Sequence, residues 1–128
     1  MKKLLFLFSV LLFLQSCQGT AIDDSTVSAP TQQMVEKRQQ IQNYINSFSC
    51  SAAVGCSSIA FGDKPCGGPR EYLVFSNAVN LTLLQSMVAE YNLLDKQNNI
   101  KTNAVSDCMI VQPPTNTGCV NGVCAVTN

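Results

Sequence analysis

The sequence lacks histidine, carries little charge and contains no apolar run long enough to cross a bilayer. Without histidine, nucleophilic catalysis by a Ser-His or Cys-His pair is excluded. Only 12% of the residues are charged, and no block of like charge occurs. We therefore expect no nucleic-acid binding, which needs a clustered basic face. The longest apolar stretch, 4–14, is much shorter than the roughly 20 residues of a transmembrane helix.

The N-terminus has the parts of a bacterial lipoprotein signal peptide. Lys2 and Lys3 precede the apolar stretch 4–14, and Leu14-Gln15-Ser16-Cys17 resembles a lipobox. We therefore expect residues 1–16 to be removed and Cys17 to carry a diacylglyceryl group and an amide-linked chain such as palmitate. Several acyl chains anchor a protein stably without a spanning helix. The alternative is ordinary cleavage that leaves Cys17 as a thiol.

Residues 17–30 are predicted to be the acylated cysteine and a flexible linker, because Ser, Thr, Ala and acidic residues dominate them. Gln18 stands where an aspartate would favour the inner membrane, so we predict the outer membrane of a Gram-negative cell envelope. The remaining residues, 31–128, have the length of one small domain. The side of the membrane that this domain faces is left open.

Two segments have the apolar spacing of helices that pack on a core. The first is predicted over 31–48, with Thr31 as its cap and apolar residues at Met34, Ile41, Ile45 and Phe48. The second is predicted over 81–98, with Asn80 as its cap and an apolar stripe of Leu84, Met87, Val88, Tyr91 and Leu94. We interpret this stripe as core.

Several short segments favour strands. Residues 57–61 and 72–76 are rich in apolar, β-branched and aromatic side chains, and 109–112 is an apolar run stopped by two prolines. Residues 118–126 predict a hairpin, because Asn121-Gly122 is the preferred type I′ turn. We therefore expect an α+β fold in which two helices pack on a small antiparallel sheet of about four strands, stapled by disulfides.

A loop of unusual composition, Lys64-Pro-Cys-Gly-Gly-Pro69, joins the first two predicted strands. Its prolines fix φ and its glycines permit backbone angles that a Cβ would forbid, so we expect a rigid shape. Rigid loops bind at low entropic cost, which makes this one the candidate binding site. The residues that we assign to it are Lys64, Gly67, Gly68, Arg70 and Tyr72. The alternative is a purely structural corner.

The cysteine count predicts three disulfides. Cysteines of an exported chain pair as a rule, and beyond Cys17 there are six: Cys50, Cys56, Cys66, Cys108, Cys119 and Cys124. Metal binding is the alternative use of cysteines. The chain has no histidine and no Cys-x2-Cys spacing, so we expect neither a metal nor another cofactor.

Two disulfide schemes are open. In both, Cys66–Cys108 ties the loop to the end of the second helix. In the first, the other bridges are local, with Cys119–Cys124 closing the hairpin and Cys50–Cys56 closing its own turn. In the second, the segment of Cys50 and Cys56 is cross-linked to the hairpin, with Cys50 and Cys56 joined to Cys119 and Cys124. We favour the local scheme, because the hairpin register places Cys119 opposite Cys124.

The chain resembles a group of small secreted bacterial proteins and lipoproteins. The resemblance rests on Cys56-Ser-Ser-Ile-Ala-Phe-Gly-Asp-Lys-Pro-Cys-Gly-Gly-Pro69 followed by Tyr72-Leu-Val-Phe-Ser76. Three further shared features are Cys50 six residues before Cys56, a long helix that ends near Ser106-Asp-Cys108, and the final Cys-x4-Cys. The resemblance implies an exported domain, and it implies no activity, substrate or catalytic residue.

These observations favour a non-catalytic, lipid-anchored envelope protein that binds another protein or an envelope component. Its predicted partners are the membrane, through the N-terminal lipid, and an envelope protein. The alternatives are a passive structural lipoprotein, a small periplasmic inhibitor of a lysozyme or protease, and a small hydrolase. For the hydrolase, the scattered carboxylates leave only Asp63 and Glu71, which flank the loop, as an acid/base pair.

Overall fold

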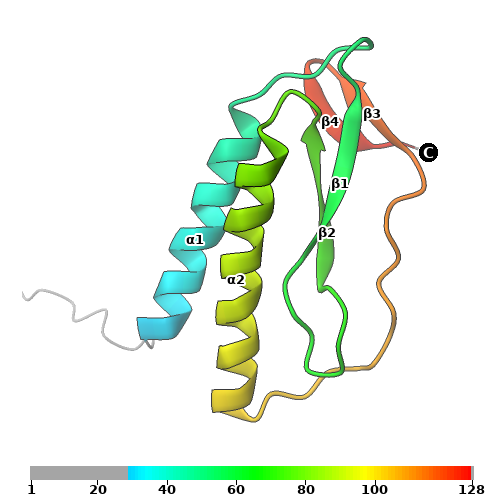
Figure 1. The fold of residues 1–128 in the computed structure, drawn as a ribbon. Helices are drawn as coiled ribbons and strands as arrows, with labels where there is room; N and C mark the ends of the chain where they lie inside the picture. The colour runs from blue at the N-terminus through cyan, green and yellow to red at the C-terminus, as the bar shows by residue number, and fades with distance from the viewer. Residues whose placement is uncertain (1–28, 128) are drawn as a thin grey trace, which may run out of the picture.

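The computed structural model describes residues 29–127 (Figure 1). The predicted signal peptide, the acylated Cys17 and most of the predicted linker lie outside these residues. No helix of this described part is both long and apolar enough to cross a membrane. The elements in chain order are α1 (Ala29–Asn46), β1 (Cys56–Phe61), β2 (Glu71–Ser76), α2 (Leu81–Thr102), β3 (Thr117–Val120) and β4 (Val123–Val126).

The expected α+β class is confirmed, and its four strands form two antiparallel pairs rather than one sheet. β1 pairs with β2, and β3 pairs with β4. The predicted strand over 109–112 is wrong, because these residues belong to no strand and Met109 and Ile110 are exposed. The carbonyl of Met109 instead accepts a hydrogen bond from Lys64 Nζ at 2.8 Å.

α1 begins and ends two residues earlier than predicted. The helix includes Pro30, which a first turn tolerates because the missing N–H would have no helical partner there. Thr31, the predicted cap, therefore lies inside the helix. The sequence pattern located the helix correctly but misplaced its ends.

α2 begins where the sequence predicts. The Asn80 side chain accepts a hydrogen bond from Leu83 N at 3.1 Å, as expected of an N-cap. The helix runs four residues beyond the predicted end, to Thr102, and Asn103 closes it with a left-handed backbone at φ 49°. The added turn carries α2 to the level of the β1–β2 loop (Figure 1).

The core lies between the two helices and one face of the β1–β2 pair. Phe61 is fully buried and stacks on Tyr91, with ring centroids 4.1 Å apart. Four residues of the predicted stripe of α2 are confirmed as core, with Leu84, Val88 and Tyr91 buried and Met87 packed against them, whereas Leu94 is only half-buried and lies outside the cluster. Ile59 of β1 packs against the same cluster. The buried members of this cluster are Ile41, Ile45, Phe61, Leu73, Phe75, Val79, Leu84, Val88 and Tyr91.

The β3–β4 hairpin has the predicted type I′ turn, because Asn121 and Gly122 both have positive φ, at 51° and 81°. Cys119 does lie opposite Cys124 in the register. The favoured local disulfides are nevertheless wrong, since the bridges are Cys50–Cys119 and Cys56–Cys124. The four-residue strands of this hairpin offer little apolar surface to hold them to β1 and β2, and the two cross-links provide that attachment.

The alternating directions of α1, β1, β2 and α2 divide the domain into two ends (Figure 1). One end holds the β3–β4 hairpin. The other holds the start of α1, the loop 62–70, the last turn of α2 and the segment 103–110, and we call it the loop end. The candidate binding loop lies at this second end.

Candidate functional site

The loop 62–70 depends on glycine, as its sequence predicts. Gly62, Gly67 and Gly68 have φ of 82°, 90° and 82°, which a side chain strongly disfavours. Two backbone hydrogen bonds close the tip, from Lys64 N to the Gly68 carbonyl at 2.9 Å and from Gly67 N to the Lys64 carbonyl at 2.8 Å. The tip is therefore a compact turn.

Arg70 and Asp95 form the ion pair that fixes the base of the loop. Arg70 donates from Nε to Asp95 Oδ2 at 2.6 Å and from a terminal nitrogen to Oδ1 at 2.9 Å. The same terminal nitrogen reaches Asn99 Oδ1 at 2.8 Å. The carboxylate is 1% exposed and the pairing is bidentate, which is the strongest geometry for this pair. The hydrogen bond to Asp95 raises the pKa of Arg70.

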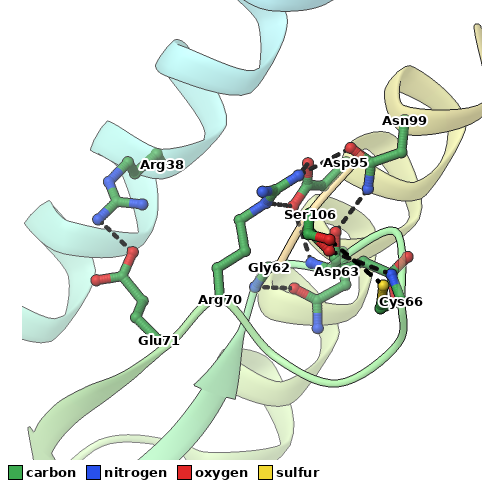
Figure 2. A network of polar contacts seen from close by, with 10 residues as sticks. Arg38, Gly62, Asp63, Cys66, Arg70, Glu71, Asp95, Asn99 and Ser106 are labelled. Carbon is green, nitrogen blue, oxygen red and sulfur yellow. Dashed lines mark hydrogen bonds and ion pairs between the residues drawn. The ribbon is translucent and has the colours of Figure 1, made fainter. Parts of the chain in front are cut away.

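Three side chains on one face of α2 also hold the backbone of the loop (Figure 2). Asp95 Oδ2 accepts from Asp63 N at 2.8 Å, and Asn99 Nδ2 donates to the Asp63 carbonyl at 2.6 Å. Asn92 Oδ1 accepts from Gly62 N at 2.7 Å. These residues satisfy both backbone groups of Asp63, so the loop is attached to the helix by polar contacts rather than by packing.

Lys64 and a disulfide attach the loop to the segment after α2. Lys64 is 9% exposed and donates from Nζ to Asp107 Oδ1 at 2.7 Å, and this hydrogen bond lowers the pKa of Asp107. The predicted Cys66–Cys108 bridge is present beside this ion pair. Cys66 N also donates to Ser106 Oγ at 3.4 Å (Figure 2). The loop therefore has anchors on two sides.

The structure separates the predicted binding residues into anchors and an exposed tip. Lys64 and Arg70 hold the loop in place through their charged groups, and Tyr72 is half-buried in β2. Gly67 and Gly68 are exposed, and a Cβ built on either would meet nothing within 4 Å. Among the predicted binding residues, the two glycines of the tip are therefore the ones that make no anchoring side-chain contact.

The two carboxylates of the hydrolase alternative lie apart. Glu71 pairs with Arg38 of α1, whose terminal nitrogen lies 2.6 Å from Glu71 Oε1. Asp63 lies on the other side of Arg70, beside Asn99 and Cys66 (Figure 2). The loop therefore does not present them as an opposed pair.

Exposed apolar side chains lie on the segments that adjoin the loop. Ile100, Val105, Met109 and Ile110 are 70%, 93%, 71% and 81% exposed, and all belong to the last turns of α2 or to the segment 103–110. A cavity of about 250 Å³ lies among Asp63, Pro65, Lys96, Asn99, Ile100 and Ala104. The apolar run 109–112 predicts a strand, so its sequence pattern gave no indication of an exposed surface here.

Three cysteine sulfurs lie close enough to share a metal ion, since Cys50, Cys56 and Cys124 have Sγ atoms within 4.8 Å of one another. All three belong to disulfides, and a disulfide sulfur is not the thiolate that zinc binds. In this oxidised state the cluster is a pair of adjacent cross-links.

Comparisons of the chain with protein-family models, with curated proteins and with solved structures give no match.

Proposed function

We propose that the protein is a non-catalytic, lipid-anchored envelope protein of the outer membrane that binds its ligand with the loop end. Cys17 carries the lipid and residues 18–28 link it to the domain. The observation that carries the proposal is the arrangement of the loop end. Two ion pairs within it, Lys64–Asp107 and Arg70–Asp95, hold the loop, while apolar side chains of the segment 103–110 are exposed.

This arrangement suits binding because the surface is fixed before contact. The loop is held by two ion pairs, a disulfide and hydrogen bonds to α2. A fixed surface loses little conformational freedom when it binds, so more of the contact energy contributes to affinity. Exposed apolar residues that gather on one short segment, as Val105, Met109 and Ile110 do, are found at interaction sites.

Site-specific photo-crosslinking in cells tests the proposal. A photoreactive amino acid replaces Met109 at the loop end in the full-length protein, and the matched control replaces Val123, which is 64% exposed at the hairpin end. We expect adducts, with protein or with lipid, from position 109 and few from position 123. Equal labelling at both positions, or labelling at 123 alone, would contradict the assignment. The intact mass of the purified protein reports separately whether Cys17 is acylated.

A further inference from the structure

We infer that the ligand of the loop end is the surface of the phospholipid bilayer itself. This inference rests on the proposed function, because it uses the lipid on Cys17. It adds the identity of the contacted molecule and the orientation of the domain. The juxtaposition that carries it is between the start of α1 and the exposed apolar residues, which lie at the same end of the domain (Figure 1).

The tether brings this end to the membrane. Residues 18–28 separate Cys17 from Ala29, and eleven residues span at most about 40 Å when fully extended. The flexible linker that their composition predicts would average about 20 Å between its ends. The loop end is therefore held near the bilayer at an effective concentration of the order of millimolar, at which a weak contact is already populated.

The chemistry of the loop end fits a bilayer surface. Interfacial binding needs apolar side chains that enter the headgroup boundary and cations beside them that attract anionic lipids. Val105, Met109 and Ile110 supply the first. Lys96 and Lys101 supply the second, since both are exposed and neither has an ion-pair partner among the described residues.

The internal ion pairs reduce an obstacle to this contact. A carboxylate without a partner would resist the approach of an anionic, low-dielectric surface. Asp107, although it is exposed, is paired with Lys64, and Asp95 is buried against Arg70. Asp63 has no ion-pair partner among the described residues, but it is half-buried and lines a cavity together with Lys96. The segment that carries Val105 and Met109 is also fixed by the Cys66–Cys108 bridge, so little order has to be gained on contact.

The hairpin end provides the comparison. Val120, Val123 and Val126 are also exposed, so exposure alone does not choose between the two ends. The hairpin lies at the opposite end from the start of α1 (Figure 1). The 18 residues of α1 are about 27 Å long, and the linker would have to run back over that length to bring the hairpin to the membrane. A fully extended linker could do this, but a flexible chain of this length averages only about 20 Å between its ends, so the position of the tether favours the loop end.

Tryptophan provides the test, because the chain contains none. Val105→Trp and Ile110→Trp report on the loop end, and Val123→Trp is the matched control at the hairpin end. Each full-length acylated variant is reconstituted in vesicles of phosphatidylethanolamine with a minority of phosphatidylglycerol, and the fluorescence is compared with and without brominated acyl chains. We expect strong quenching at positions 105 and 110 and weak quenching at 123. Equal or absent quenching at the two ends overturns the inference.

The lysines add a second readout. Lys96→Gln combined with Lys101→Gln should lower the ratio of contacting to detached loop ends about 25-fold in anionic vesicles, because each lysine contributes about fivefold. Position 105 reports this change, and vesicles of phosphatidylcholine alone should show no effect. An unchanged ratio in anionic vesicles overturns the role of the lysines.

Failure of this inference is distinguishable from failure of the proposed function. One combination of results refutes this inference alone: the variants are bound to vesicles in a flotation assay, the tryptophan at position 105 is not quenched, and the photoreactive residue at 109 labels a protein. The bilayer is then not the ligand, but the loop end still binds. If position 109 labels neither protein nor lipid, both proposals fail.

Discussion

Removal of the arginine from the Arg70–Asp95 pair should destabilise the domain far more than removal of a surface cation. Arg70→Met keeps an apolar stem of similar length and leaves a carboxylate whose side chain is 2% exposed. Asp95 then retains one charge-stabilising donor in the present geometry, Asp63 N. Breaking a buried pair by removing one partner costs about 3–5 kcal/mol, and we expect a loss of that size in the free energy of unfolding.

The other half of the pair should be less sensitive. The Arg70 side chain is 41% exposed, so after Asp95→Leu its guanidinium can turn toward water and recover part of its hydration. The combined variant Arg70→Met and Asp95→Leu leaves no buried charge, and such apolar replacements are often neutral. We therefore expect the double variant to be more stable than Arg70→Met alone. If the costs of the two substitutions simply added, the double variant would instead be the less stable of the two.

Urea unfolding of the oxidised full-length protein, followed by the helical circular dichroism signal, measures these differences. The control is Lys37→Met, which removes the Lys37–Glu90 pair at an exposed site and should cost about 0–1 kcal/mol. A cost for Arg70→Met no larger than this control would refute the reasoning. So would a double variant that is less stable than either single one.

Three further predictions concern the loop end. Gly62→Ala places a Cβ 2.8 Å from the Cγ of Arg70 at a backbone φ of 82°, and it should lower the free energy of unfolding in urea by about 2 kcal/mol. Gly67→Ala has open space around its Cβ and should cost about 1 kcal/mol. Similar losses for the two variants would contradict the steric argument. The double variant Cys66→Ser and Cys108→Ser removes a disulfide between residues 42 apart, which raises the chain entropy of the unfolded state. The same urea assay should show a loss of about 4 kcal/mol in the free energy of unfolding, and a negligible loss would contradict the presence of the bridge. The hydrogen bond from Lys64 lowers the pKa of Asp107 in the folded state, so the ionised carboxylate stabilises the fold above the ordinary aspartate pKa of about 4, and this contribution is lost as the pH falls through the lower folded value. Asp107→Asn should therefore be less stable than the natural protein at about pH 6, and the difference in urea unfolding should shrink as the pH falls below about 4. A pH-independent difference would contradict that assignment.

Much of the fold follows from local rules in the sequence. The Asn80 cap, the β-rich run 72–76 and the Asn121-Gly122 turn each act within a few residues of themselves, and all three are confirmed. Local signals were sufficient at these positions. The Cys66–Cys108 bridge is also confirmed, but Cys108 lies six residues beyond the end of α2 and not at the helix end where it was expected.

The rest depends on which segments meet in space. Asp95 and Asn99 continue the apolar stripe of α2 at helical spacing from Tyr91, but polar side chains usually indicate a solvated face. Their burial results from the arrival of Arg70 and the loop backbone, from a segment more than twenty residues earlier in the chain. The hairpin disulfides were mispredicted for the same reason, since register within the hairpin says nothing about which strand lies against it.

Different interactions stabilise different parts of this small domain. The β1–β2 face is held by apolar packing around Phe61, whereas the loop end has no strand and is held by ion pairs, backbone hydrogen bonds and a disulfide. Ion pairs are directional, so they can fix a glycine-rich loop in one shape even where an apolar cluster would be as stable. Because this end does not need its apolar side chains for stability, Val105 and Ile110 remain on the surface, where they are available for contact.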